Sequence, residues 1–241
     1  MPMTGVGHSI MTRAGLVSLA FALAVAALLL SLAVPRTIAA FQEMPGNSVM
    51  GRVAAGKEAD DDALALLAES RRNADAWVTS GRVLDEIAHV DFLRAARSGE
   101  AGGLDEAGLR RALSGIDASL AVAPANPHGW VRRAYAALLL NHPPEEVASA
   151  LTMSMLTARY EPDLMYARLA VSLESWNYFS ADDRLLVLDQ VRMAWRRKPA
   201  RLVELAASAG RIGVVYTALA GDITALADLD RRLAAQRRKA N

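Results

Sequence analysis

The stretch SLAVAPANPHGW, from Ser119 to Trp130, suggests the fold because it marks a joint between two helices. Pro124 and Pro127 stand between a run that has the pattern of a helix end and a tryptophan that opens the next helical pattern. Proline cannot donate a backbone hydrogen bond, and it turns the preceding residue away from helical geometry. If this joint recurs, the chain is a helical repeat.

Similar joints occur twice more. YEPDLMYARL, which contains Pro162, and RKPARLVEL, which contains Pro199, again place a proline between two helical patterns. Pro124, Pro162 and Pro199 are 38 and 37 residues apart. A recurrence of that length, with two helices in each unit, is the period of a solenoid.

The composition also predicts an all-α protein. Hydrophobic residues make up 53% of the 241 residues and aromatic residues only 5%, and the abundant Ala and Leu lose little on entering a helix. The formal charge of +1 gives no general attraction for nucleic acid, so no nucleic-acid partner is expected. The absence of cysteine excludes disulfides, thiolate metal sites and a cysteine nucleophile.

An apolar segment near the amino terminus predicts a membrane anchor. Ala14 to Val34 is a run of 21 uncharged residues bracketed by Arg13 and Arg36. As a helix it would be about 31 Å long, which matches the hydrocarbon core of a bilayer. We therefore expect a short tail (residues 1–13) and one transmembrane helix that contacts the lipid bilayer. A secretory signal cleaved after TIAA (37–40) and a buried soluble helix are the alternatives.

The orientation of the span follows weakly from its flanks, because a single arginine lies close to each side. The short tail in front of it and the long region behind it resemble a bacterial signal-anchor arrangement. The expected location is the bacterial inner membrane, with the body in the periplasm.

Residues 35–59 are predicted to form a linker or irregular collar, because Pro35 should end the apolar helix and the segment mixes Pro, Gly, Asn and charges. Its apolar residues could instead line a groove or touch lipid headgroups. A helical domain should follow over residues 60–241, with helices at about 74–97 and 109–122 on either side of a glycine-rich loop.

Several residues then resemble the tetratricopeptide repeat family, whose signature combines Trp, small residues, Ala and a closing Pro. Trp77 with Gly81 and Leu84, and Trp130 with Ala134, fit its first helix, although Ser80 replaces the usual leucine. The second helices match at three places: Ala112, Ile116, Ser119 and Pro124; Ala150, Ser154, Thr157 and Pro162; and, more weakly, Val187, Val191, Ala194 and Pro199.

The resemblance covers about residues 63–220, with units longer than the usual length of about 34 residues. It implies a solenoid of about three to four helix hairpins, with Trp77 and Trp130 buried between paired helices. A non-repeating helical bundle is the alternative.

Proteins of this family usually bind other proteins in a concave groove lined by the first helix of each pair. If the alignment holds, the partner-binding residues that face this groove are Arg82, Asp85, Val131, Tyr135 and Leu138. Val78 and Val131 occupy positions where a carboxylate clamp would need basic residues, so capture of a chaperone's acidic tail is disfavoured.

No pattern in the sequence predicts catalysis. The four histidines (His8, His89, His128 and His142) are scattered and form no HExxH motif, and we expect no metal and no cofactor. Acidic pairs stand at expected helix starts, where they favour the helix dipole. Nucleotide-binding and nucleophile-elbow motifs are missing from the sequence, so an enzyme is not expected. Basic clusters at 196–198 and 237–239 remain, the second as a solubilising helix end.

The expected function is therefore a membrane-anchored protein-binding scaffold or assembly factor of the bacterial cell envelope. By fold-level analogy it would be accessory to envelope polysaccharide assembly or secretion. One alternative is a structural accessory subunit of a larger membrane complex. A less favoured one is an envelope enzyme that acts on glycan or peptide.

Overall fold

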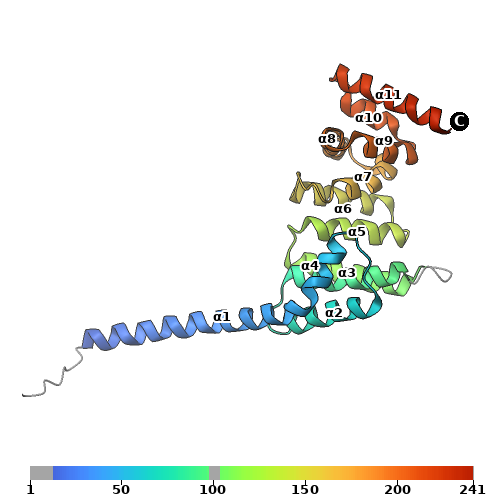
Figure 1. Cartoon of the computed structure of the whole chain (residues 1–241). Helices are drawn as coiled ribbons and strands as arrows, with labels where there is room; N and C mark the ends of the chain where they lie inside the picture. Colours follow the sequence, from blue (N-terminus) through green and yellow to red (C-terminus); the bar gives the residue numbers. More distant parts are fainter. Residues whose placement is uncertain (1–12, 98–103, 241) are drawn as a thin grey trace, which may run out of the picture.

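The computed structural model describes residues 13–97 and 104–240, which form eleven α-helices and one short 3₁₀-helix and contain no strand. The predicted all-α fold is confirmed. Figure 1 shows α1 projecting from one end of the molecule, while the other helices stack into a column. The predicted tail lies outside the described residues except for Arg13. The helices are α1 (Arg13–Ala54), α2 (Asp61–Asp75), α3 (Gly81–Arg97), α4 (Glu106–Val122), α5 (Pro127–Leu139), α6 (Pro144–Thr157), α7 (Met165–Glu174), η2 (Trp176–Tyr178), α8 (Ala181–Arg197), α9 (Pro199–Ser208), α10 (Ile212–Leu219) and α11 (Ile223–Ala240).

All three proline joints lie at helix junctions. Pro124 lies between α4 and α5, Pro162 between α6 and α7, and Pro199 is the first residue of α9. Asn126 caps α5, because its Oδ1 accepts a hydrogen bond of 3.1 Å from the backbone N–H of His128. Two helices therefore fall between successive joints. The likeness to tetratricopeptide repeats stays a prediction.

The prediction that Pro35 ends the apolar helix is wrong. Pro35 and Pro45 both lie inside α1. Near Pro35, Arg36 Nη1 donates to the carbonyl of Leu32 (2.7 Å) and Thr37 Oγ1 to that of Ala33 (2.9 Å), so side chains satisfy carbonyls on the last turn of the span. The last turns of α1 bend away from its long axis (Figure 1), as expected of a proline-interrupted helix.

Most of the predicted linker is thus helix, because α1 packs on α2 in this region. Ala39, Gly46 and Val49 are buried along one face of α1. A Cβ atom on Gly46 would collide with Ser70 Oγ and lie 3.1 Å from Leu67 Cδ1. The lack of a side chain at Gly46 therefore lets α1 and α2 approach closely.

The start predicted for the next helix is also wrong. α2 continues to Asp75, and Trp77 lies in the turn before α3 with half of its surface exposed, so it is not buried between paired helices. Trp130 is partly buried in α5, and its Nε1 donates to the carbonyl of Pro124 (2.8 Å). Gly81 does mark a close approach, because a Cβ atom there would collide with Ala123 Cβ and lie 3.1 Å from the carbonyl oxygen of Ser119.

Two regions of the body are packed differently. A large apolar core extends from α5 to α11 and includes Leu151, Leu169 and Leu202, all fully buried. A much smaller cluster joins α1, α2 and α3 through residues such as Val49 and Leu67. The connection of α1 to the body therefore has little apolar surface of its own.

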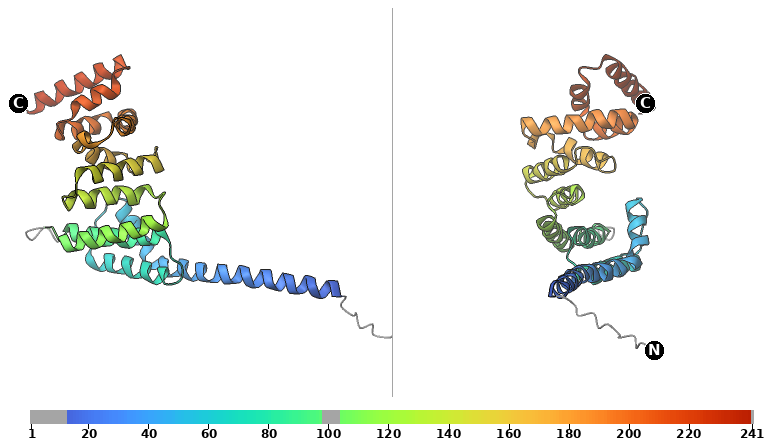
Figure 2. Two further views of the ribbon diagram at one scale, coloured as in Figure 1. Left: turned by 180° about the vertical axis from the view of Figure 1, so that it is seen from behind. Right: turned by 90° about the vertical axis from the view of Figure 1, so that its left-hand side faces the viewer.

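The apolar part of α1 makes no such contacts. α1 is long and apolar enough to cross a membrane, and none of its most apolar window is buried within the described structure. Its leucines are exposed. The helix itself projects alone from the body (Figures 1 and 2).

Candidate functional site

The five residues predicted to bind a partner do not lie in one pocket. Arg82 and Asp85 line a pocket of about 510 Å³ between α1, α3 and α5, whereas Tyr135 lines a different pocket. Val131 is buried, and Leu138, like Tyr135, is partly buried against the large apolar core. A binding role for the five residues stays a prediction.

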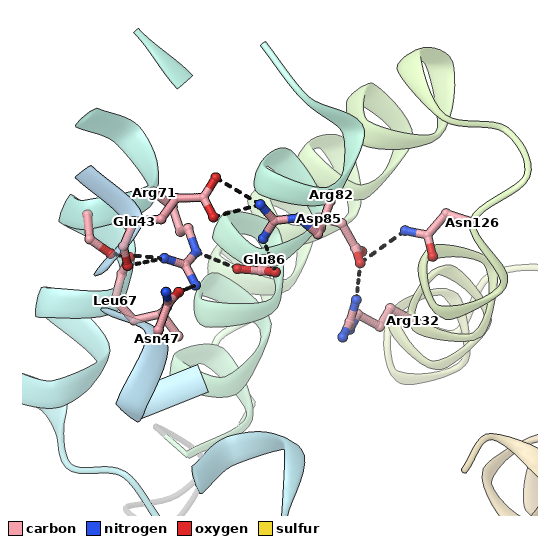
Figure 3. Close-up of polar contacts among 10 residues, drawn as sticks. Glu43, Asn47, Leu67, Arg71, Arg82, Asp85, Glu86, Asn126 and Arg132 are labelled. Atoms are coloured by element: carbon pink, nitrogen blue, oxygen red, sulfur yellow. Dashed lines mark hydrogen bonds and ion pairs between the residues drawn. The ribbon is translucent and has the colours of Figure 1, made fainter. Parts of the chain in front are cut away.

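Asp85 is held between α3 and α5. Its Oδ2 accepts a hydrogen bond of 3.1 Å from Asn126 Nδ2 and forms an ion pair with Arg132 Nη1 (Figure 3). Only 4% of the residue is exposed, and Oδ1 has no hydrogen-bond partner among the described residues. Asp85 therefore connects α3 to α5 and its cap in the wall of the first pocket, and its Oδ1 remains an acceptor without a hydrogen bond from the described residues.

Arg82 belongs to a second network that joins α1 to α3. Its Nη2 lies 2.6 and 2.8 Å from the two carboxylate oxygens of Glu43, and its Nη1 lies 2.8 Å from Glu86 Oε1 (Figure 3). The pKa of Arg82 is raised, chiefly by the hydrogen bond to Glu43 and then by Glu86, while partial burial opposes the rise. The Arg82 side chain is thus held against α1 on the rim of the pocket.

Arg71 lies at the centre of the same network. It is fully buried in α2, and its Nε forms an ion pair with Glu86 Oε2. Its Nη1 donates to the carbonyl of Glu43 (2.8 Å) and its Nη2 to Asn47 Oδ1 (2.9 Å). One guanidinium therefore ties α2 to both α1 and α3, in a geometry that a planar fork of donors provides. We call Glu43, Arg71, Arg82 and Glu86 the anchor network.

The pKa values of two histidines near the first pocket are lowered. The pKa of His89 is lowered to about 3, mainly by burial and then by Arg132 and His128. Burial also lowers the pKa of His128, which lines the pocket. His8 lies outside the described residues. Among the described residues no group of three or more His, Cys, Asp or Glu side chains could hold a metal ion.

A second pocket of about 470 Å³ lies farther along the stack, between α5, α7 and α9. Tyr135 lines it, and its hydroxyl donates to the carbonyl of Ala167 (3.1 Å). Burial, followed by the charge of Glu174, raises the pKa of Tyr135. The guanidinium of Arg201 stacks over the ring of Tyr166, 4.5 Å from its centre, as in cation–π pairs.

The wall of the second pocket is basic. Arg197, Lys198 and Arg201 are all exposed, and within the described part of the chain none of the three forms an ion pair. Asp163 is the one carboxylate of the pocket wall. Two of these cations belong to the basic cluster at 196–198, a sequence signal that had no assigned role. The arrangement can attract a negatively charged group.

Both pockets lie on helices that come first in their pairs. α3 and α5 supply most of the first, and α5, α7 and α9 most of the second, together with the junctions before them. We call the face that these two pockets share the groove face.

Comparison with known proteins gives no family for this chain: no protein-family model matches it, and neither the curated proteins nor the solved structures include a match.

Proposed function

We propose that the chain is a membrane-anchored scaffold that binds another protein along the groove face. The observation that carries this proposal is the placement of two pockets on the same series of helices, α3, α5, α7 and α9. Stacked helix pairs present such a face as an extended binding surface.

The second pocket supports a partner that carries acidic side chains. Arg197, Lys198 and Arg201 supply three positive charges that no described carboxylate pairs with, and Tyr166 adds an aromatic face. Arginine and tyrosine are enriched among the residues that dominate binding energies. These cations lie at and beside the α8–α9 junction. Val78 and Val131, which disfavour a carboxylate clamp at their own positions, lie elsewhere and so do not exclude an acidic partner here.

The anchor supports a role at the membrane surface. α1 continues as one helix, bent in its last turns, from its apolar part into the body, and the anchor network ties it to α2 and α3. A partner bound on the groove face would be held at a fixed place relative to the bilayer. Placement in a bacterial inner membrane, with the body in the periplasm, stays a prediction.

Site-specific photo-cross-linking in native membranes tests the proposal. A photoreactive residue replaces Tyr166 in the second pocket, and a matched probe replaces Ser114, which is exposed on α4 outside both pockets. We expect a discrete cross-linked protein with the probe at Tyr166 and none with the probe at Ser114. Equal cross-linking at both positions would contradict the proposal.

A charge reversal tests the chemistry of the partner. With the probe at Tyr166, the double substitution K198E/R201E should abolish the cross-link, because it replaces two cations of the pocket with carboxylates. The control R237E/R238E makes the same change of charge on exposed residues of α11. A cross-link that survives K198E/R201E would show that the acidic partner has been assigned wrongly.

A further inference from the structure

The helix pairs have two kinds of ends. The junctions α2–α3, α4–α5 and α6–α7 lie on the side toward which α1 extends, and we call them the near ends; the junctions α3–α4 and α5–α6 lie on the opposite side and are the far ends. The two broadside views, Figure 1 and the left view of Figure 2, agree on this placement. The near ends therefore face the apolar part of α1.

Four large exposed apolar side chains lie at the near ends, against Leu104 at the described far ends. Trp77 in the α2–α3 turn is 50% exposed and Tyr160 in the α6–α7 turn is 65% exposed. Val122 and Leu156, in the last turns of α4 and α6, are 52% and 60% exposed. Tryptophan and tyrosine with one apolar and one polar edge are enriched at the membrane–water interface.

The first turns of the helices differ in their acidic residues, although Glu161 and Asp163 lie just before α7 at a near end. The first turns of α2, α4 and α6, which start at far ends, carry the pairs or single residues Asp61 and Asp62, Glu106, and Glu145 and Glu146. Among the described helices that start at near ends, α3, α5 and α7 have no acidic residue in the first turn. The helix dipole favours a carboxylate at every amino terminus, so the dipole alone does not account for this difference between first turns.

The level of the near ends follows from the packing of α1 on α2. The two helices are antiparallel (Figure 1), and a Cβ atom on Gly46 would meet Ser70 and Leu67. Ala39 precedes Gly46 by seven residues, and Trp77 follows Ser70 by seven residues. Because the two helices are antiparallel, Ala39 and Trp77 lie at about the same position along the axis of α1. Ala39 follows the last residue of the apolar run, Val34, by about 7.5 Å of helix rise. The headgroup region on each side of a bilayer is about 5 to 7 Å thick.

We propose that the body lies along the membrane surface, with its near ends in contact with the lipid headgroups and with Trp77 and Tyr160 as interfacial side chains. The contact is most apolar at the first two near ends, because the α6–α7 junction also carries Arg159 and Asp163. The partner is the headgroup layer of the same bilayer that holds α1. This proposal requires α1 to span the bilayer, but it does not depend on protein binding at the groove face.

The absence of cysteine makes the test direct, because single cysteines can be labelled without background. Spin labels are placed at near ends (W77C, Y160C) and at far ends (L104C, E145C) of the full chain, reconstituted in nanodiscs that contain nickel-chelating lipid headgroups. Leu104 and Glu145 are exposed, as Trp77 and Tyr160 are, so labels at all four positions are accessible. Nickel should strongly enhance relaxation of the two near labels and leave the far labels close to their values in nickel-free nanodiscs.

Two controls test whether α1 spans the bilayer and whether each variant is folded. A label at L23C, in the middle of the apolar run, should be reached by oxygen but not by aqueous nickel chelate, and circular dichroism of each variant should match the unsubstituted chain. Equal relaxation of near and far labels would overturn the proposal. Near labels that the lipid nickel does not reach, with L23C inside the bilayer, would also overturn it, since the body would then stand clear of the headgroups. A label at L23C that is exposed to water would show that α1 does not span the bilayer, and this would also overturn the proposal. The cross-linking at Tyr166 would still test protein binding separately.

Discussion

The joint between α1 and the body and the core of α5 to α11 are held together by different kinds of interaction. In the core, fully buried leucines from successive helices contact one another. At the joint, the apolar cluster is small, and the buried Arg71 connects three helices through charged and polar groups. Apolar contact is non-directional, whereas a guanidinium fork accepts partners only in fixed directions. The angle between α1 and the body is therefore fixed by directional polar contacts. The core depends chiefly on filling the space between its helices with apolar side chains.

The core has one buried arginine of its own, which sharpens the contrast. Arg168 donates to the hydroxyl and carbonyl of Ser154 (2.9 and 2.7 Å) and to the carbonyl of Ala158 (2.9 Å). Burial lowers its pKa. It satisfies carbonyls at the end of α6, whereas Arg71 forms an ion pair with a carboxylate of another helix. A buried cation in the core thus serves one helix end, and a buried cation at the joint sets the positions of three helices.

The largest effect is expected from R71M, which removes the buried charge and leaves its partner Glu86 in place. Breaking a buried ion pair from one side costs about 3 to 5 kcal/mol of unfolding free energy, and Arg82, which also pairs with Glu86, should bring the loss toward the lower end of that range. Denaturant unfolding of the full chain in detergent would measure it, and R72A, at an exposed position of the same helix, should change stability by less than about 0.5 kcal/mol. Spin-label distances between α1 and α3 should also broaden. A loss below about 1 kcal/mol would show that charge does not hold the joint.

L169A tests the other region. Leu169 is fully buried in the large core, so truncation should cost about 2 to 5 kcal/mol through lost burial and a residual cavity. The same denaturant measurement applies, with L156A as control because Leu156 is mostly exposed. The distances between α1 and α3 should stay narrow in L169A. Broadened distances would mean that the two regions are not distinct.

G81A tests the close approach of α3 to α4, which lies between the two regions. The new Cβ atom would collide with Ala123 and press on the backbone carbonyl of Ser119, so we expect a loss of about 1 to 3 kcal/mol. Gly213 in α10 has open space around it, and G213A should stabilise the helix by about 0.5 to 1 kcal/mol. Melting temperatures of the two variants should therefore move in opposite directions. A stabilising G81A would contradict the close approach.

The smallest effect concerns pH. The pKa of His89 is lowered to about 3 in the folded chain, against an ordinary value of 6.5, so the unfolded chain binds the extra proton first. His89 should therefore make unfolding easier as pH falls from about 6.5 toward 3, and should have no effect above that window. Urea unfolding of the unsubstituted chain and of H89Q at pH 7.5 and pH 5 would measure this. H89Q should lose less stability between the two pH values than the unsubstituted chain, and an equal loss would contradict the assignment.

The sequence predicts the helix junctions well, because proline acts locally. Pro124, Pro162 and Pro199 lie at helix junctions, for a reason contained within a few residues of each. The same rule fails at Pro35, where packing of the following turns on α2 favours continued helix. The spacing of Trp77 and Gly81 also misplaces the next helix, because α2 ends at Asp75 and α3 begins at Gly81.

The candidate site could be predicted only in part. Arg82, Asp85 and Tyr135 do line pockets, but the anchor network joins residues as far apart as Glu43 and Arg82, and no local pattern pairs them. One signal was present. Leu64, Leu67, Arg71 and Ala74 recur at helical spacing, which places an arginine on the apolar stripe of α2. A charge on such a stripe predicts a buried partner, although it does not identify that partner.

Because α1 stays helical through Pro35, its apolar part and the body are connected without a flexible hinge. An apolar helix adjusts to a thicker or thinner bilayer by changing its tilt. A flexible hinge after the span would absorb that change, whereas α1 continues as helix into its contacts with α2 and α3. If α1 crosses a bilayer, a rotation of the span is passed on to the column of helices, and the displacement grows toward α11, at the end of the column away from α1 (Figure 2). The position of the groove face would then change with the thickness of the membrane.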